Sequence, residues 1–162
     1  MKVTPQKIVA AVLLLYGAGY LFKNQTTRLD FFTASEFGVW YPLMNNEFLF
    51  MLDDFRREVG EPVYISPALG SLGRPDAPNS QHFPNPEIRA ADLMSKAPLE
   101  KLYSAARTVG FTGIGLYPDW QPDHGIHVDN RSNRSASNPA TWSAYKDFAG
   151  NQKYTGIETA LA

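Results

Sequence analysis

GIGLYPDWQPDHGIHVDNR, residues 113 to 131, contains two short apolar segments separated by a turn-forming stretch. Residues 113 to 118 and 126 to 130 are rich in branched and aromatic side chains, and the second segment alternates apolar with polar residues, as a half-buried strand does. Prolines, aspartates and a glycine interrupt both patterns between them. The stretch therefore predicts two β-strands, and the second of them carries His127.

Helical and strand patterns alternate through the rest of the chain. The expected helices are 46 to 59 and 99 to 110, and the expected strands are 62 to 66, 90 to 94, 113 to 118 and 126 to 130. A loop rich in glycine and proline, 67 to 88, separates the first two strands. Because the strands are few and short and the loops are long, we expect an α+β fold with a small antiparallel sheet and flanking helices.

The composition limits the classes of function. The 162 residues include 15 basic and 16 acidic side chains, and this near balance argues against nucleic acid as a partner, because binding it normally needs a basic surface. No phosphate-binding glycine motif of the GxGxxG or GxxxxGK type occurs. The chain has no cysteine, so any metal ion must be held by histidine, carboxylate or carbonyl groups.

The amino terminus differs from the rest of the chain. Residues 8 to 22, IVAAVLLLYGAGYLF, carry no charge and are flanked by Lys7 and Lys23. This length lies between that of a spanning helix and that of a signal-peptide core, so a retained anchor, a cleaved signal and a buried helix are all open. We favour a single-pass membrane anchor over residues 1–23, which would place the remainder in the cell envelope or in a phage virion membrane.

The remaining boundaries follow from changes in composition. Residues 24–30 form a polar linker, and 31–131 form the expected domain. Residues 132–162 are rich in serine, asparagine and threonine and are expected to be a peripheral tail, with one short helix around Trp142 to Phe148.

The three histidines of the chain suggest a metal site. A catalytic zinc ion typically takes three protein ligands from His, Asp or Glu, and His82, Asp92 and His127 supply such a set. The alternative is structural: His82 and His124 are solvated loop residues, His127 is bonded to a carboxylate, and Asp92 caps a turn. Spacing alone does not decide between the two interpretations.

A resemblance to a known family favours the metal site. The chain contains, in this order, SEFG at 35 to 38, LDDFRREVGEPVYIS at 52 to 66, NSQH at 79 to 82, AAD at 90 to 92, GFTGIGLYP at 110 to 118 and IHVDNR at 126 to 131. Together these stretches resemble the zinc D-Ala-D-Ala metallopeptidase family, which includes bacterial D,D-carboxypeptidases and phage endolysins. The resemblance implies a D-Ala-D-Ala carboxypeptidase/hedgehog-like fold, with Zn²⁺ bound by His82, Asp92 and His127.

The resemblance also implies roles for residues near the ligands. In the family that the chain resembles, the general base is an acid just upstream of the last ligand. Asp123 or His124 would therefore take the proton of the attacking water, and we favour Asp123. Arg74 and Ser80 would contact the substrate.

Other neighbours are assigned less specific roles. Asp129 and Arg131 are expected to brace His127. Trp40, Tyr117 and Trp120 would line the cleft or pack in the core.

The expected function is hydrolysis of peptide bonds in peptidoglycan stem peptides by a membrane-tethered zinc enzyme, either a bacterial envelope protein or a phage virion or lysis protein. The alternative is a non-catalytic module that binds peptidoglycan with a degenerate site on the same fold. A serine hydrolase using Ser80 and His82 is disfavoured, because two residues this close in sequence lack a third orienting group.

Overall fold

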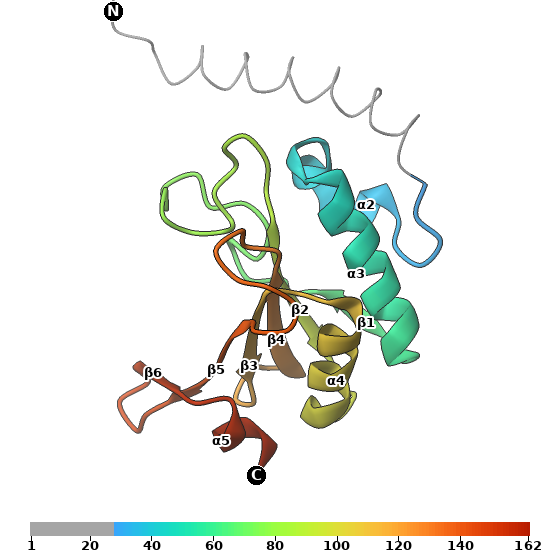
Figure 1. Cartoon of the computed structure of the whole chain (residues 1–162). Coiled ribbons are helices and arrows are strands. Elements are labelled where there is room, and N and C mark those ends of the chain that lie inside the picture. Colours follow the sequence, from blue (N-terminus) through green and yellow to red (C-terminus); the bar gives the residue numbers. More distant parts are fainter. Residues whose placement is uncertain (1–27) are drawn as a thin grey trace, which may run out of the picture.

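A six-stranded sheet with helices packed on one face forms the body of the protein, as Figure 1 shows for the computed structural model. The structure describes residues 28–162. The strands are β1 Val63–Ile65, β2 Ala90–Ser95, β3 Gly113–Tyr117, β4 His124–Asp129, β5 Ala140–Lys146 and β6 Gln152–Thr155, in the order β1-β2-β4-β3-β5-β6. The helices are α2 Ala34–Phe37, the 3-10 helix η1 Gly38–Leu43, α3 Asn46–Val59, α4 Leu99–Val109 and α5 Glu158–Leu161. The predicted α+β class is confirmed.

Helix α3 has the bounds that the sequence predicts because both of its ends are capped. The Asn45 side chain accepts a hydrogen bond from the Phe48 amide at 3.0 Å, and Gly60 ends the helix in the left-handed conformation. One face of the helix is fully buried against the sheet, through Phe48, Leu49, Leu52, Phe55 and Val59. Helix α4 packs beside it and ends in the same way at Gly110.

Alternation along the central strands separates the core from the opposite face of the sheet. Leu93, Ile114, Leu116, Ile126 and Val128 all lie in the core, and none of them is exposed. Because successive side chains of a strand point to opposite faces, the residues between them lie on the face away from helices α3 and α4. Asp92 and His127 are two of these residues, so the strands that build the core also position the candidate ligands.

The sheet is mixed, which corrects the expectation of a purely antiparallel one. Strand β5 runs parallel to β3, and the other pairs are antiparallel. The segment expected to form a helix around Trp142 to Phe148 is mostly this strand. Its pairing satisfies the backbone groups along the outer edge of β3, which would otherwise be unpaired.

The carboxyl-terminal segment belongs to the sheet. The Ser143 hydroxyl donates a hydrogen bond to the Gly156 carbonyl at 2.7 Å, and α5 lies next to α4 and β5. Residues 132–162, expected to be a peripheral tail, therefore supply two strands and a helix.

The expected membrane anchor, residues 1–23, lies outside the described residues. Within residues 28–162, no helix is both long and apolar enough to cross a membrane.

The segment before α2 is attached to α3 by one buried carboxylate. Asp53 is 8% exposed and accepts hydrogen bonds from the backbone amides of Asp30, Phe31 and Phe32, at 2.9, 2.8 and 2.7 Å. This contact seats the Phe32 ring in the core.

We expect Asp53→Ala to lower the free energy of unfolding by about 3 kcal/mol, because it leaves one buried and two partly buried amides without an acceptor. The matched control is Asp54→Ala, whose carboxylate is half exposed and, within residues 28–162, forms an ion pair with Arg57 alone; its cost is expected to be under about 0.5 kcal/mol. Urea denaturation of the full chain measures both, and equal losses would contradict the assigned role of Asp53.

Candidate metal centre

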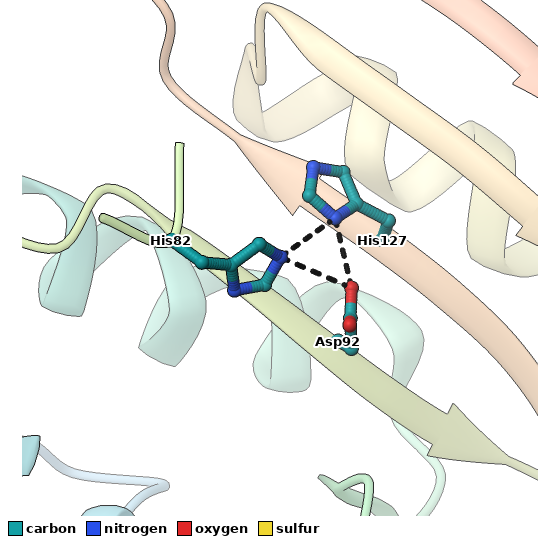
Figure 2. A group of neighbouring side chains, drawn as sticks. All are labelled: His82, Asp92 and His127. Atoms are coloured by element: carbon teal, nitrogen blue, oxygen red, sulfur yellow. Dashed lines mark hydrogen bonds and ion pairs between the residues drawn. The ribbon is translucent and has the colours of Figure 1, made fainter. Parts of the chain in front are cut away.

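Three donor atoms converge on the polar face of the sheet (Figure 2). His82 Nε2 and His127 Nδ1 are 3.2 Å apart, and Asp92 Oδ1 lies 2.8 Å from His127 Nδ1 and 3.4 Å from His82 Nε2. All three residues are buried, with exposed fractions of 1%, 5% and 7% for His82, Asp92 and His127. These are the three residues that the sequence nominated, and together they could hold a metal ion.

Strand register and a loop bring the group together. Asp92 on β2 lies directly opposite His127 on β4 in the antiparallel pair, so their side chains share one face. His82 reaches the same point from the loop between β1 and β2. Its backbone amide donates to the Ser80 hydroxyl at 3.2 Å, and its carbonyl accepts from the Arg74 amide at 2.9 Å, which holds the loop in place.

Each histidine has a second partner that orients its ring. His82 Nδ1 lies 2.8 Å from the Leu72 carbonyl, which can only accept, so this nitrogen carries a proton and Nε2 presents its lone pair. His127 Nε2 lies 2.9 Å from Asp129 Oδ2, which in the same way leaves Nδ1 as the donor to a metal ion. Both imidazoles thus turn the other ring nitrogen toward the same point, where His82 Nε2 presents a lone pair and His127 Nδ1 does so once its proton is lost.

The separations fit a tetrahedral ion. Zinc bound at about 2.0–2.1 Å places tetrahedral ligand atoms about 3.3–3.4 Å apart. The two separations that involve His82 Nε2, 3.2 and 3.4 Å, are close to this value, and the 2.8 Å between His127 Nδ1 and Asp92 Oδ1 is a hydrogen-bond length that would widen by about half an ångström around the ion. Two nitrogens and one carboxylate oxygen are a donor set that zinc accepts, and three protein ligands leave one position open.

The electrostatics of the group favour a cation at its centre. Burial lowers the pKa of His127, but hydrogen bonds to Asp129 and Asp92 outweigh it and raise the pKa to about 9. Burial also opposes ionisation of Asp92, yet its hydrogen bonds with His127 and His82 hold its pKa well below the ordinary value. His82 differs, because burial is the dominant cause and its pKa is lowered. Without a metal, a proton on His127 offsets the two carboxylates, and metal binding must displace that proton.

Asp129 contacts both His127 and Arg131, the pair of contacts expected of a brace for this candidate ligand. Asp129 is fully buried and accepts from Arg131 Nε at 2.8 Å as well as from His127. Gly113 on β3 makes room for this carboxylate, since a Cβ there would lie 2.2 Å from Asp129 Oδ2. The pKa of Asp129 is depressed, because its bonds to Arg131 and His127 outweigh burial.

A polar cavity of about 240 Å³ opens beside the group. Ser80 and Arg74 line it, and the Arg74 guanidinium also donates to Asp92 Oδ2. Both residues expected to contact substrate are therefore at the cavity. Among the described residues that line it, Asp92 is the only one with a carboxylate.

Neither candidate base lies at this cavity, which corrects the expected arrangement. Asp123 precedes His127 by four residues, about 13 Å along a strand, and its carboxylate accepts from the Tyr64 hydroxyl at 2.6 Å. His124 is displaced in the same direction, and its Nδ1 lies 3.5 Å from the Pro118 carbonyl. Spacing along a strand predicts which face a residue shares, but the distance is too great for proton transfer to a group held by His127.

Aromatic residues complete the cavity wall. Tyr117 lines it, as expected, and its hydroxyl accepts from Trp142 Nε1 at 3.1 Å. Trp120 lines a neighbouring cavity, whereas Trp40 packs against the core. Trp142 and Tyr154 also line the cavity but were not singled out from the sequence. Their segment was expected to be peripheral, and only the alternation of residues 140 to 146 could have indicated a strand there.

Comparison with known proteins adds no relative: no protein-family model, curated protein or solved structure matches the chain.

We expect the full chain to bind about one zinc ion, and His82→Ala and His127→Ala each to abolish binding, because two remaining donors hold the ion poorly. Asp92→Asn should weaken binding, since the amide lacks the charge. Elemental analysis of dialysed protein measures the stoichiometry. His124→Ala, which removes the remaining histidine, is the control and should retain the metal; full occupancy in either ligand variant would rule out the assigned group.

Asp129→Asn should reduce zinc affinity by about 10–100-fold while leaving one site per chain, because the amide orients His127 less firmly than the carboxylate does. Competition titration with a coloured chelator measures the dissociation constant. Asp119→Asn, which alters a carboxylate outside the cavity, should leave the constant unchanged. An unchanged constant for Asp129→Asn would show that the brace has no influence on the metal.

Proposed function

We propose that the chain is a zinc-dependent peptidase that hydrolyses peptide bonds in peptidoglycan stem peptides. The observation that carries the proposal is the convergence of two oriented imidazole nitrogens and one carboxylate oxygen beside an open polar cavity. The resemblance of the motifs around these residues to the zinc D-Ala-D-Ala metallopeptidases supplies the substrate class. Attachment to a membrane through residues 8 to 22, in a bacterial envelope or a phage virion, is part of the same proposal and rests on the sequence.

His82, Asp92 and His127 would hold the metal. A zinc ion so bound lowers the pKa of water and polarises a carbonyl group, which is the chemistry that amide hydrolysis needs. Arg74 lies at the cavity with its guanidinium on Asp92, where it fixes the orientation of that carboxylate and offers its remaining N–H groups to an anionic substrate.

Tyr117 can donate a hydrogen bond to the reacting group. Its oxygen accepts from Trp142 Nε1, so its own hydroxyl proton is not used in that bond. Burial, together with the charge of Asp92, outweighs the Trp142 bond and raises the pKa of Tyr117 to about 12. The hydroxyl therefore stays protonated at neutral pH and can stabilise a developing oxyanion.

The absence of a second carboxylate among the described lining residues limits the rate. A positioned general acid or base contributes about 10²–10⁴-fold to a reaction of this kind. With Asp92 in the ligand group and both Asp123 and His124 outside the cavity, turnover is expected to be slower by a factor of this order than at a site with a separate base.

The lack of a second carboxylate among the described lining residues also favours a second candidate, a non-catalytic module that binds peptidoglycan. Such a module needs the cavity and its arginines but no proton acceptor. The two candidates differ in products, since only the peptidase releases new peptide ends from the wall.

Incubation of the zinc-loaded chain with purified peptidoglycan should release peptides with new ends, identified by mass spectrometry. His82→Ala should abolish release together with zinc binding. Tyr117→Phe should keep the metal and lose about tenfold or more in turnover, because the hydroxyl proton is missing. Tyr64→Phe, a tyrosine outside the cavity, is the matched control and should remain active. Retention on insoluble peptidoglycan without any released peptide would support the module instead.

A further inference from the structure

A second cavity lies next to the metal centre on the same face of the sheet. It has a volume of about 430 Å³, and Met94, Trp120 and the segment 66 to 68 form much of its wall. Met94 follows Asp92 by two residues on β2, so both side chains point to the same face. Two residues of a strand span about 6.6 Å, which is therefore the approximate offset of the second cavity from the ligands.

A shared aromatic wall joins the two cavities. Tyr117 lines the first and Trp120 the second, and their rings stack with centroids 4.4 Å apart. Gly125, which lies opposite both Met94 and Tyr117 in the sheet, has no side chain, and the Trp120 ring occupies that space. A Cβ at Gly125 would lie 2.0 Å from the ring, so the tryptophan rests flat against the sheet.

Opposite charges line the same cavity. Asp119 accepts a hydrogen bond from the Lys146 backbone amide through one carboxylate oxygen, at 2.8 Å. In residues 28–162, no ion pair involves the Asp119 carboxylate or the Lys146 ammonium group. The cavity thus offers an apolar floor, one anion and one cation.

We propose that this second cavity binds the side chain of the stem-peptide residue next to the one whose carbonyl lies at the metal group. We further propose that it selects a long aliphatic side chain that ends in both an ammonium and a carboxylate group. Met94 and Trp120 contact the methylene groups, Asp119 binds the ammonium, and Lys146 binds the carboxylate. This inference rests on the proposed function, because that function supplies the peptide.

The geometry suits such a residue. Neighbouring residues of an extended peptide are about 3.3–3.6 Å apart, and a side chain of several methylenes reaches the rest of the offset of about 6.6 Å. Apolar contact with the floor does not distinguish this side chain from that of lysine. The added carboxylate does, since only it can pair with Lys146.

The test is calorimetric titration of the zinc-loaded full chain with two product tetrapeptides, L-Ala-γ-D-Glu-X-D-Ala, in which X is meso-diaminopimelate or L-lysine. The diaminopimelate peptide should bind about tenfold or more tightly, as expected for one charge-assisted pair. Lys146→Ala should reduce its affinity to that of the lysine peptide and leave the lysine peptide unchanged. Asp119→Asn should weaken the binding of both peptides, because the charge that pairs with the ammonium group is lost. The amide oxygen of the variant can still accept the hydrogen bond from the Lys146 backbone amide.

Lys153→Ala is the control, because this exposed lysine lies on the adjacent strand and pairs with Asp147 outside both cavities. It should change neither affinity. Equal binding of the two peptides, equal losses for both in Lys146→Ala, or no binding of either peptide would overturn the inference. A preference for the diaminopimelate peptide without hydrolysis would support this inference and contradict the proposed peptidase activity. Hydrolysis without the preference would support the peptidase activity and contradict this inference.

Discussion

The convergence of two imidazole lone pairs and one carboxylate oxygen at a single buried point is the constraint on which the site depends. These groups repel one another unless a cation or a proton lies between them, so they stay together only where the surrounding structure holds them. The register of β2 and β4 places Asp92 opposite His127, and the Leu72 carbonyl and Asp129 hold the two rings. The helix-packed face of the sheet stabilises that register, because a slip by one residue would exchange the core side chains for the ligands.

Glycines shape the polar face of the sheet by leaving space above it. The Cβ positions of Gly113, Gly115 and Gly125 are taken up by the side chains of Asp129, Trp142 and Trp120, respectively. A charged brace and two indole rings can therefore lie close to the strands instead of standing away from them. Trp142 lines the first cavity and Trp120 the second, so two of these close-lying side chains form walls of the cavities.

Sequence patterns predicted the parts of the fold that depend on local periodicity and caps. Helix α3, strands β3 and β4 and the grouping of His82, Asp92 and His127 all appear where they were expected. The pairing of β5 with β3 was not predicted, because the two strands are far apart in the sequence. Strand β5 also lies in a segment whose serines and asparagines suggest a loop. Asp123 does not line the cavity, because a residue four positions before His127 shares its strand face but lies about 13 Å away along the chain.

The positions of the three candidate ligands in the fold have a mechanical consequence. Asp92 and His127 belong to the sheet, whereas His82 belongs to a loop that also carries Arg74 and Ser80. An ion bound by all three would act as a removable cross-link that closes this loop onto the sheet and reduces the conformational freedom of the segment between β1 and β2. Chelation would then do more than take away a reactive ion: it would loosen one wall of the cavity, so the shape of the site and the presence of its metal would be lost together.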